Sequence, residues 1–197
     1  MRKRLLGAVF ALAVLLSGCS GGGVTVNGSS VEIASAGAGI SLPEGWEIFT
    51  GDDIYEVTYA RNPEAYGSAE ELKKDLEENG ERYIVYAESP DEDALALFSS
   101  QPLESAELGA LARTTHDSTV FEYRVNDYYT ESSLSEENLD GVSGWLSEIT
   151  VFEEAGAPAL SQQREFMFER DGTVYSLRIF ARGLIDEQAQ MLSVYMI

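Results

Sequence analysis

The sequence predicts an α+β domain with a largely antiparallel sheet flanked by helices. A capped helix stands early in the chain, consecutive short strand-like runs fill the middle, and a second helix is expected at the carboxyl end. Hydrophobic residues make up 44% and charged residues 24% of the 197 residues, which is typical of a globular protein. One cysteine excludes an intrachain disulfide, so the domain must fold by burying an apolar core.

The early helix has the clearest boundary signals. It is expected over residues 69–79, because Ser68 and Glu71 have the spacing of a capping box. Leu72 and Leu76 lie four residues apart, so only one narrow face of the helix is apolar. Such a helix is expected to lie on the surface of the domain.

Strands are predicted from alternating apolar residues and from the turn residues that bound them. In one run, Phe121 and Tyr123 alternate with charged neighbours, as in a half-buried strand. A short helix is also expected between residues 103 and 112, although Gly109 weakens it. The predicted strands cover residues 31–34, 40–42, 83–87, 94–98, 119–125 and 145–152.

A hairpin is predicted around Asp171 and Gly172, a two-residue loop of the type favoured between antiparallel strands. Pairing Arg170 with Thr173 brings the large apolar residues onto one face, and we expect this face to turn toward a layer of helices. These residues are Phe166, Phe168, Tyr175, Leu177 and Ile179. A closing helix is expected to begin near Asp186 and to turn three apolar residues inward, Ala189, Leu192 and Met196.

The amino terminus has the layout of a secretory signal. Residues 1–4 are basic, and residues 5–16 form an apolar stretch broken only by Gly7. A helix of that length reaches about 18 Å, which is too short for a hydrocarbon core of about 30 Å. Residues 1–18 are therefore predicted to be a signal peptide.

Residues 16–19, Leu-Ser-Gly-Cys, resemble the lipobox of bacterial lipoproteins. The resemblance implies transfer of a diacylglyceryl group to the sulfur of Cys19, cleavage before Cys19, and often a further acyl chain, such as palmitate, on the new amine. Cys19 supplies the only thiolate in the chain. The alternative is an ordinary signal peptide with an incidental cysteine. The resemblance implies that the protein is anchored at the cell membrane, on its extracytoplasmic face.

The remaining chain is expected to be a tether followed by a single α+β domain. Residues 19–30 are rich in Gly and Ser and predict a flexible tether, and residues 31–197 contain no second linker. The formal charge of −21 argues against a nucleic-acid surface. Because anionic lipids repel such a surface, attachment to the membrane must depend on the acyl chains.

From about residue 33 onward the chain resembles the PsbP-like fold. The resemblance rests on a short hairpin with the segment 40–46, the capped helix, a strand meander and the segment 185–189. That family includes an extrinsic protein of photosystem II, a nuclear-import factor and many bacterial lipoproteins. The resemblance implies an α/β/α sandwich and binding roles rather than catalysis. Ile185 departs from the pattern, since a capping Ser or Thr is expected there.

No catalytic residue is assigned. His116 is the only imidazole, and the polar residues around it predict an exposed loop histidine that is dispensable. The acidic clusters 52–53 and 91–93 adjoin turn residues, and we expect solvated turns, with a weak divalent-cation site as the alternative. No motif predicts a cofactor, and no residue is assigned as a metal ligand.

Tyrosines are the most informative aromatic residues. Tyr128 and Tyr129 follow a predicted strand among polar residues, and they are the candidate partner surface. The alternative is that these rings pack under a loop or along a sheet edge. Trp46 and Trp145 are expected to be core anchors rather than ligand platforms.

Three functions are compatible with these observations. The first is a non-catalytic binding or accessory module with a protein partner in the cell envelope, because the tether presents a compact acidic domain. The second is a hydrolase with an unrecognised carboxylate site, since paired carboxylates suffice for glycoside hydrolysis. The third is the solute-binding component of a transporter, which usually needs two lobes where this chain has room for one.

Overall fold

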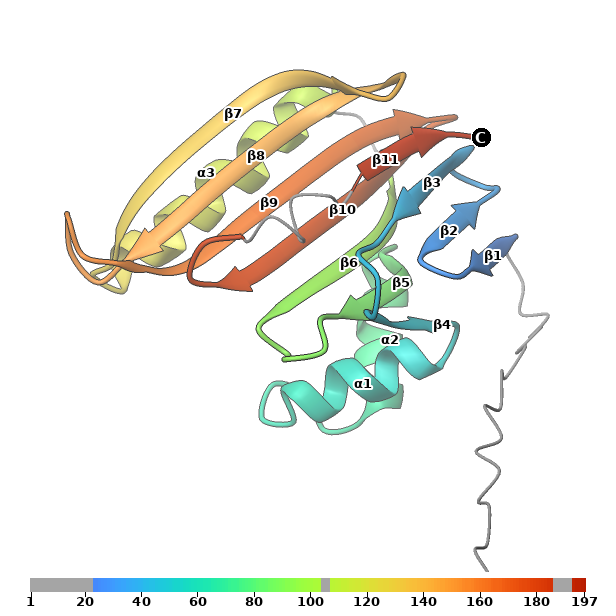
Figure 1. Ribbon diagram of the computed structural model, residues 1–197, viewed down its shortest axis with the longest axis horizontal. Helices are drawn as coiled ribbons and strands as arrows, with labels where there is room; N and C mark the ends of the chain where they lie inside the picture. The colour runs from blue at the N-terminus through green and yellow to red at the C-terminus, as the bar shows by residue number, and fades with distance from the viewer. Residues whose placement is uncertain (1–22, 104–106, 186–192) are drawn as a thin grey trace, which may run out of the picture.

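The computed structural model describes residues 23–103, 107–185 and 193–197, shown in Figure 1. Within these residues, helices and strands form two sheets in which every strand pairing is antiparallel. The predicted α+β class and its antiparallel sheet are confirmed. No described helix is long and apolar enough to cross a membrane.

The larger sheet has seven strands in the order β4-β5-β6-β10-β9-β8-β7. Its strands are β4 (Glu47–Thr50), β5 (Arg82–Glu88), β6 (Ala94–Pro102), β7 (Tyr129–Leu139), β8 (Val142–Phe152), β9 (Ala159–Arg170) and β10 (Thr173–Arg182). The smaller sheet has the order β1-β2-β3-β11. Its strands are β1 (Val24–Asn27), β2 (Ser30–Ile33), β3 (Ala38–Ser41) and β11 (Ser193–Met196).

The helices cover one face of the larger sheet. They are α1 (Asp53–Arg61), α2 (Ala69–Glu78) and α3 (Leu108–Val125). Buried residues of α1 and α2 pack against Tyr83 of β5, whereas α3 packs over β7, β8 and β9. The strand register links Tyr83 through Ser99 and Ser176 to Met167, which lies under α3. Because side chains alternate along a strand, all three helices therefore lie on the same face.

The opposite face of the larger sheet packs against the four-stranded sheet. The predicted hairpin register is confirmed, with Phe168 opposite Tyr175 and Phe166 opposite Leu177. These side chains are buried, but they face Val31, Ile33 and other residues of the smaller sheet, so the expectation that they turn toward helices is wrong. Alternating side chains show that a strand has two different faces, but they do not indicate which layer of the domain covers each face.

The helical layer that an α/β/α sandwich needs on this second face is not among the described residues. The predicted closing helix falls mainly on residues 186–192, which lie outside them. Met196, expected to point inward from that helix, belongs to β11 and is half exposed. β11 itself is a terminal strand that pairs with β3.

The early helix forms as predicted. The backbone N–H of Glu71 donates a hydrogen bond to Ser68 Oγ at 3.1 Å, and Leu72 and Leu76 are buried. Residues 31–34, 40–42, 83–87, 94–98 and 145–152 also lie within or beside strands as expected. The cap residues and apolar patterns that specify these segments span only a few residues, so they can be recognised in the sequence.

Residues 119–125 were expected to form a strand, but they belong to α3. Ala112, His116 and Val120 recur every four residues and form the buried stripe of this helix. The alternation of Phe121 with its neighbours does not mark a buried strand face, since Phe121 is exposed. The predicted helix at 103–112 is also misplaced, because α3 begins at Leu108.

Part of the expected tether is folded. β1 pairs with β2 through a two-residue loop at Gly28 and Ser29, where Gly28 has a positive φ of 62°. Glycine at that loop position is a hairpin signal, and Val24 and Val26 alternate as strand residues do. The ordered domain therefore includes residues from Val24 onward. Residues 1–22, with the predicted signal peptide and Cys19, lie outside the described part of the chain.

Candidate functional site

The carboxyl end of α3 closes with a Schellman motif that places Tyr128. Asp127 adopts the left-handed conformation at φ 64°. The N–H of Tyr128 then donates to the carbonyl oxygen of Tyr123 at 3.2 Å, and the N–H of Asp127 donates to that of Arg124 at 3.1 Å. The rings of Tyr128 and Tyr123 meet edge to face, with centroids 6.4 Å apart. The motif thus holds Tyr128 rigidly beside the helix end.

Tyr129 begins β7 directly after this motif. It pairs with Phe152 of β8, and the two ring centroids lie 5.9 Å apart. The next residue, Thr130, is buried and accepts a hydrogen bond from Arg124 Nε at 3.3 Å. The two predicted tyrosines therefore lie at a sheet edge, on a fixed backbone rather than in a loose loop.

Two apolar residues in the last turns of α3 are also exposed, on the side of the helix that points away from the sheet. Phe121 and Val125 lie four residues apart on the helix and are 67% and 58% exposed. Tyr128 and Tyr129 are 41% and 43% exposed. We call these four exposed residues, which lie around the carboxyl end of α3 and on more than one face, the α3–β7 aromatic surface. Large apolar side chains that are exposed close together are candidate contacts for a protein partner.

The sequence missed the two helical residues of this surface, because they had been assigned to the buried face of a strand. Their position around the helix is the signal that could have identified them. They fall outside the buried stripe of Ala112, His116 and Val120, so a helical reading of residues 108–125 would have left both of them exposed.

A hollow of about 450 Å³ adjoins the aromatic surface. Its lining combines aromatic rings, one arginine and several carboxylates: Arg124, Asp127, Tyr128, Tyr129, Thr130, Glu153 and Glu154. Asp127, Glu153 and Glu154 give its rim a negative charge at neutral pH. This rim favours a partner that brings lysine or arginine side chains beside an apolar centre.

His116 is not the exposed loop residue that the sequence predicted. It lies in α3, is 9% exposed, and its Nδ1 lies 2.8 Å from Ser147 Oγ on β8. The prediction was wrong because the same polar neighbours are solvent-facing positions of a helix whose buried stripe contains His116. Burial lowers the pKa of His116, so the ring is neutral at pH 7.

The contact between His116 and Ser147 contains the residue types of a serine nucleophile and its base, but its surroundings differ from those of an active site. Ser147 is 4% exposed under the helix, so a substrate has no approach to its hydroxyl. Asp117, the next residue of the helix, points about 100° away from His116. The pair therefore acts as a hydrogen bond between α3 and the sheet.

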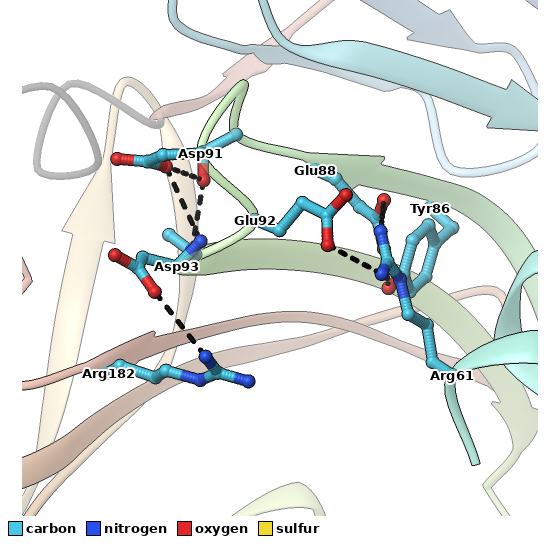
Figure 2. Close-up of polar contacts among 9 residues, drawn as sticks. Arg61, Tyr86, Glu88, Asp91, Glu92, Asp93 and Arg182 are labelled. Atoms are coloured by element: carbon cyan, nitrogen blue, oxygen red, sulfur yellow. Dashed lines mark hydrogen bonds and ion pairs between the residues drawn. The ribbon is translucent and has the colours of Figure 1, made fainter.

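The acidic turn between β5 and β6 is tied to two arginines (Figure 2). Arg61, in the last turn of α1, donates to both carboxylate oxygens of Glu88 at 2.8 and 2.6 Å, and to Glu92 at 2.7 Å. Tyr86 also donates to Glu88, at 2.6 Å. On the other side of the turn, Asp93 faces Arg182, with 3.6 Å between the charged groups.

Hydrogen bonds keep two carboxylates of this turn, Glu88 and Asp91, ionised. Hydrogen bonds from Arg61 lower the pKa of Glu88, and the Ser89 hydroxyl, which donates to Asp91 at 2.6 Å, lowers the pKa of Asp91. A carboxylate that accepts several hydrogen bonds is a poor proton donor at neutral pH. The network thus fastens α1 to the β5–β6 turn, and Glu88 and Asp91 do not have the raised pKa of a general acid.

The other acidic cluster is also engaged in a contact. Asp52 accepts a hydrogen bond from Lys73 of α2 at 2.8 Å, at the start of α1. Among the residues that the structure describes, no group of three or more histidine, cysteine or acidic side chains is arranged to hold a metal ion.

The two tryptophans pack as structural anchors. Trp46 is buried in the core between the two sheets. Trp145 is partly buried under α3, where it packs with Met167 and Ala112. A Cβ atom added to Gly109 would come within 2.8 Å of the Trp145 ring. Gly109 therefore lets α3 approach the sheet closely rather than interrupting the helix.

Comparison with known proteins identifies no family. No protein-family model matches the sequence, and no curated protein matches it. Among solved structures, the chain is similar to the solution structure of cyanobacterial PsbP (CyanoP) from Synechocystis sp. PCC 6803. That likeness has 11% identity and a TM-score of 0.47, and it covers 85% of this chain and 86% of that chain.

The chain is also similar to a crystal structure from Bacteroides thetaiotaomicron, with 13% identity and a TM-score of 0.43. That likeness covers 87% of this chain and 49% of the other, so the chain spans about half of that protein. The similarity to CyanoP agrees with the resemblance to the PsbP-like fold that was seen in the sequence. With TM-scores below 0.5, neither likeness carries an argument about function.

Proposed function

We propose that this protein is a non-catalytic accessory module that binds a protein partner in the cell envelope, with an acyl anchor at Cys19. The observation that supports the binding role is the α3–β7 aromatic surface. Its four large side chains are each more than two fifths exposed, on a rigid helix end and a strand. Aromatic side chains provide much contact area while losing little conformational entropy on binding.

A hydrolase remains the weaker candidate, because no described observation favours it. Glu88 and Glu92 of the β5–β6 turn are paired with Arg61. Ser147 is buried beside His116. The acidic rim of the aromatic surface instead supports a basic protein partner.

The binding role is tested by capture from envelope extract with the full chain as bait. We expect the double variant Phe121→Ser with Tyr128→Ser to retain the captured partner at least about tenfold less well, since interface aromatics are frequent hot spots. Leu184→Ser is the matched control, because Leu184 is 64% exposed and lies outside the aromatic surface. Equal capture by the double variant and the control would exclude this surface as the binding site.

The anchor is tested by cell fractionation. The basic residues 1–4, the apolar residues 5–16 and the lipobox ending at Cys19 together support lipidation. We expect Cys19→Ala to abolish lipid attachment and to release the protein from the membrane fraction, with Ser20→Ala as the control. Unchanged processing and membrane association of Cys19→Ala would refute the anchor.

A further inference from the structure

The outer edge of β7 is the starting observation. β7 is an eleven-residue strand at the end of the larger sheet, and among the described residues it pairs only with β8. Its ladder with β8 runs from Tyr129 to Leu139 without a register shift. A long, regular edge strand is a template for another strand. The other edge of this sheet, β4, has only four residues.

The turn after β7 determines which backbone groups face outward. Asp140 and Gly141 form a two-residue loop with φ values of 46° and 92°, flanked by the pair of Leu139 and Val142. In such a hairpin the flanking pair is hydrogen-bonded, and hydrogen-bonded pairs then alternate along the ladder. The backbone N–H and C=O groups that point away from β8 are therefore those of Thr130, Ser132, Leu134, Glu136 and Asn138.

Arg124 marks the side of α3 that is nearest to this edge. Val120 packs on β8, and Arg124 reaches Thr130 on β7. At about 100° per residue, Phe121 lies about 60° beyond Arg124 around the helix, and Val125 about 100° beyond it. An added strand would lie about 4.8 Å outside β7. Phe121 and Val125 lie about 140° and 180° around the helix from His116, so they point away from the sheet and from that strand.

Charge decides between possible occupants. Glu131 and Glu137 are exposed on the face of β7 opposite α3, and the whole chain has a formal charge of −21. A second copy of the chain would bring such carboxylates together across the new ladder, which is unfavourable. A basic segment would instead place lysine or arginine opposite them.

We propose that β7 binds a basic, extended segment of the partner protein as an additional antiparallel strand. Apolar side chains of that segment lie on the α3 side of the sheet, beside Leu134, and its cationic side chains alternate with them and meet Glu131 and Glu137. The antiparallel direction follows the pairing of the whole sheet. This inference rests on the proposed binding function and specifies its mode and the chemistry of the partner.

The first test uses a labelled nine-residue peptide of alternating valine and lysine, titrated into the full chain in detergent micelles by fluorescence anisotropy. The valine residues, which face α3, turn their N–H groups toward β7 in this arrangement. N-methylation of the valines is expected to weaken binding at least about tenfold, and N-methylation of the lysines less than about threefold. An unmodified peptide that fails to bind, or equal binding of both methylated peptides, overturns the proposal.

The second test changes the protein. Ser132→Pro removes an outward N–H while keeping the bonds to β8, so we expect peptide affinity to fall at least about tenfold. Ser132→Ala keeps that N–H and is the matched control, with affinity expected within about twofold of the wild type. Circular dichroism checks that Ser132→Pro is folded. If this variant does not fold, the binding of the methylated peptides to the wild-type protein tests strand addition instead.

The outcomes separate this inference from the proposed function. An envelope partner that depends on Phe121 and Tyr128 but binds Ser132→Pro normally supports the aromatic surface and overturns strand addition. A dimer in light scattering that Ser132→Pro converts to monomer identifies a second copy as the occupant and also overturns it. Capture that is independent of both the aromatic surface and β7 overturns the proposed function itself.

Discussion

Replacing Phe168 by alanine is expected to lower the free energy of unfolding by about 3–5 kcal/mol. Phe168 is 2% exposed and packs between the two sheets. Its ring lies beside those of Phe98, Phe166 and Tyr175, with centroid distances of 6.2, 6.1 and 5.4 Å. Truncation would leave a cavity that these stacked rings and the backbones of two sheets can fill only partly.

Urea denaturation of the full chain measures this loss. Phe121→Ala is the matched control, because it removes the same side chain from a position that is 67% exposed. We expect the control to change stability by less than about 0.5 kcal/mol. A comparable small loss for Phe168→Ala would mean that the two sheets do not pack through this face.

His116→Ala is expected to cost about 1–3 kcal/mol, because it leaves the buried Ser147 hydroxyl without its partner. A double-mutant cycle with Ser147→Ala separates this contact from general packing. Since removing both partners leaves no orphaned polar group, the double variant should lose less stability than the two single variants together. Strict additivity would contradict an energetic link between the helix and the sheet at this point.

The same residue gives stability a pH dependence. Burial lowers the pKa of His116 below its unfolded value of about 6.5, so the unfolded chain binds the proton more readily. The stabilising contribution is complete above that unfolded pKa and is lost as pH falls through the folded pKa. Between pH 7.5 and 5.5, wild-type protein should lose more stability than His116→Gln, which has no group that titrates there. Partner binding at pH 7.5 should be unchanged in His116→Gln, because His116 lies beneath α3 and outside the aromatic surface.

The sequence by itself determined the elements whose causes are local. Ser68 caps α2 because its hydroxyl needs only the N–H of Glu71, three residues away. Asp171 and Gly172 set the register of β9 and β10 because both adopt the positive φ that their tight turn requires. The exposed positions of Tyr128 and Tyr129 were also predictable, although their Schellman motif and strand edge were not.

Only the tertiary structure decided which layer covers each face and where the side chains of α3 point. Residues 119–125 have the β-branched and aromatic composition of a strand, yet they form a helix because Ala112, His116 and Val120 bury a stripe on the sheet. That packing leaves Phe121 and Val125 exposed on the side of α3 that points away from the sheet, and it buries His116 against Ser147. The alternation of residues along a chain specifies that two faces differ, but contacts between segments far apart in the sequence determine what each face meets.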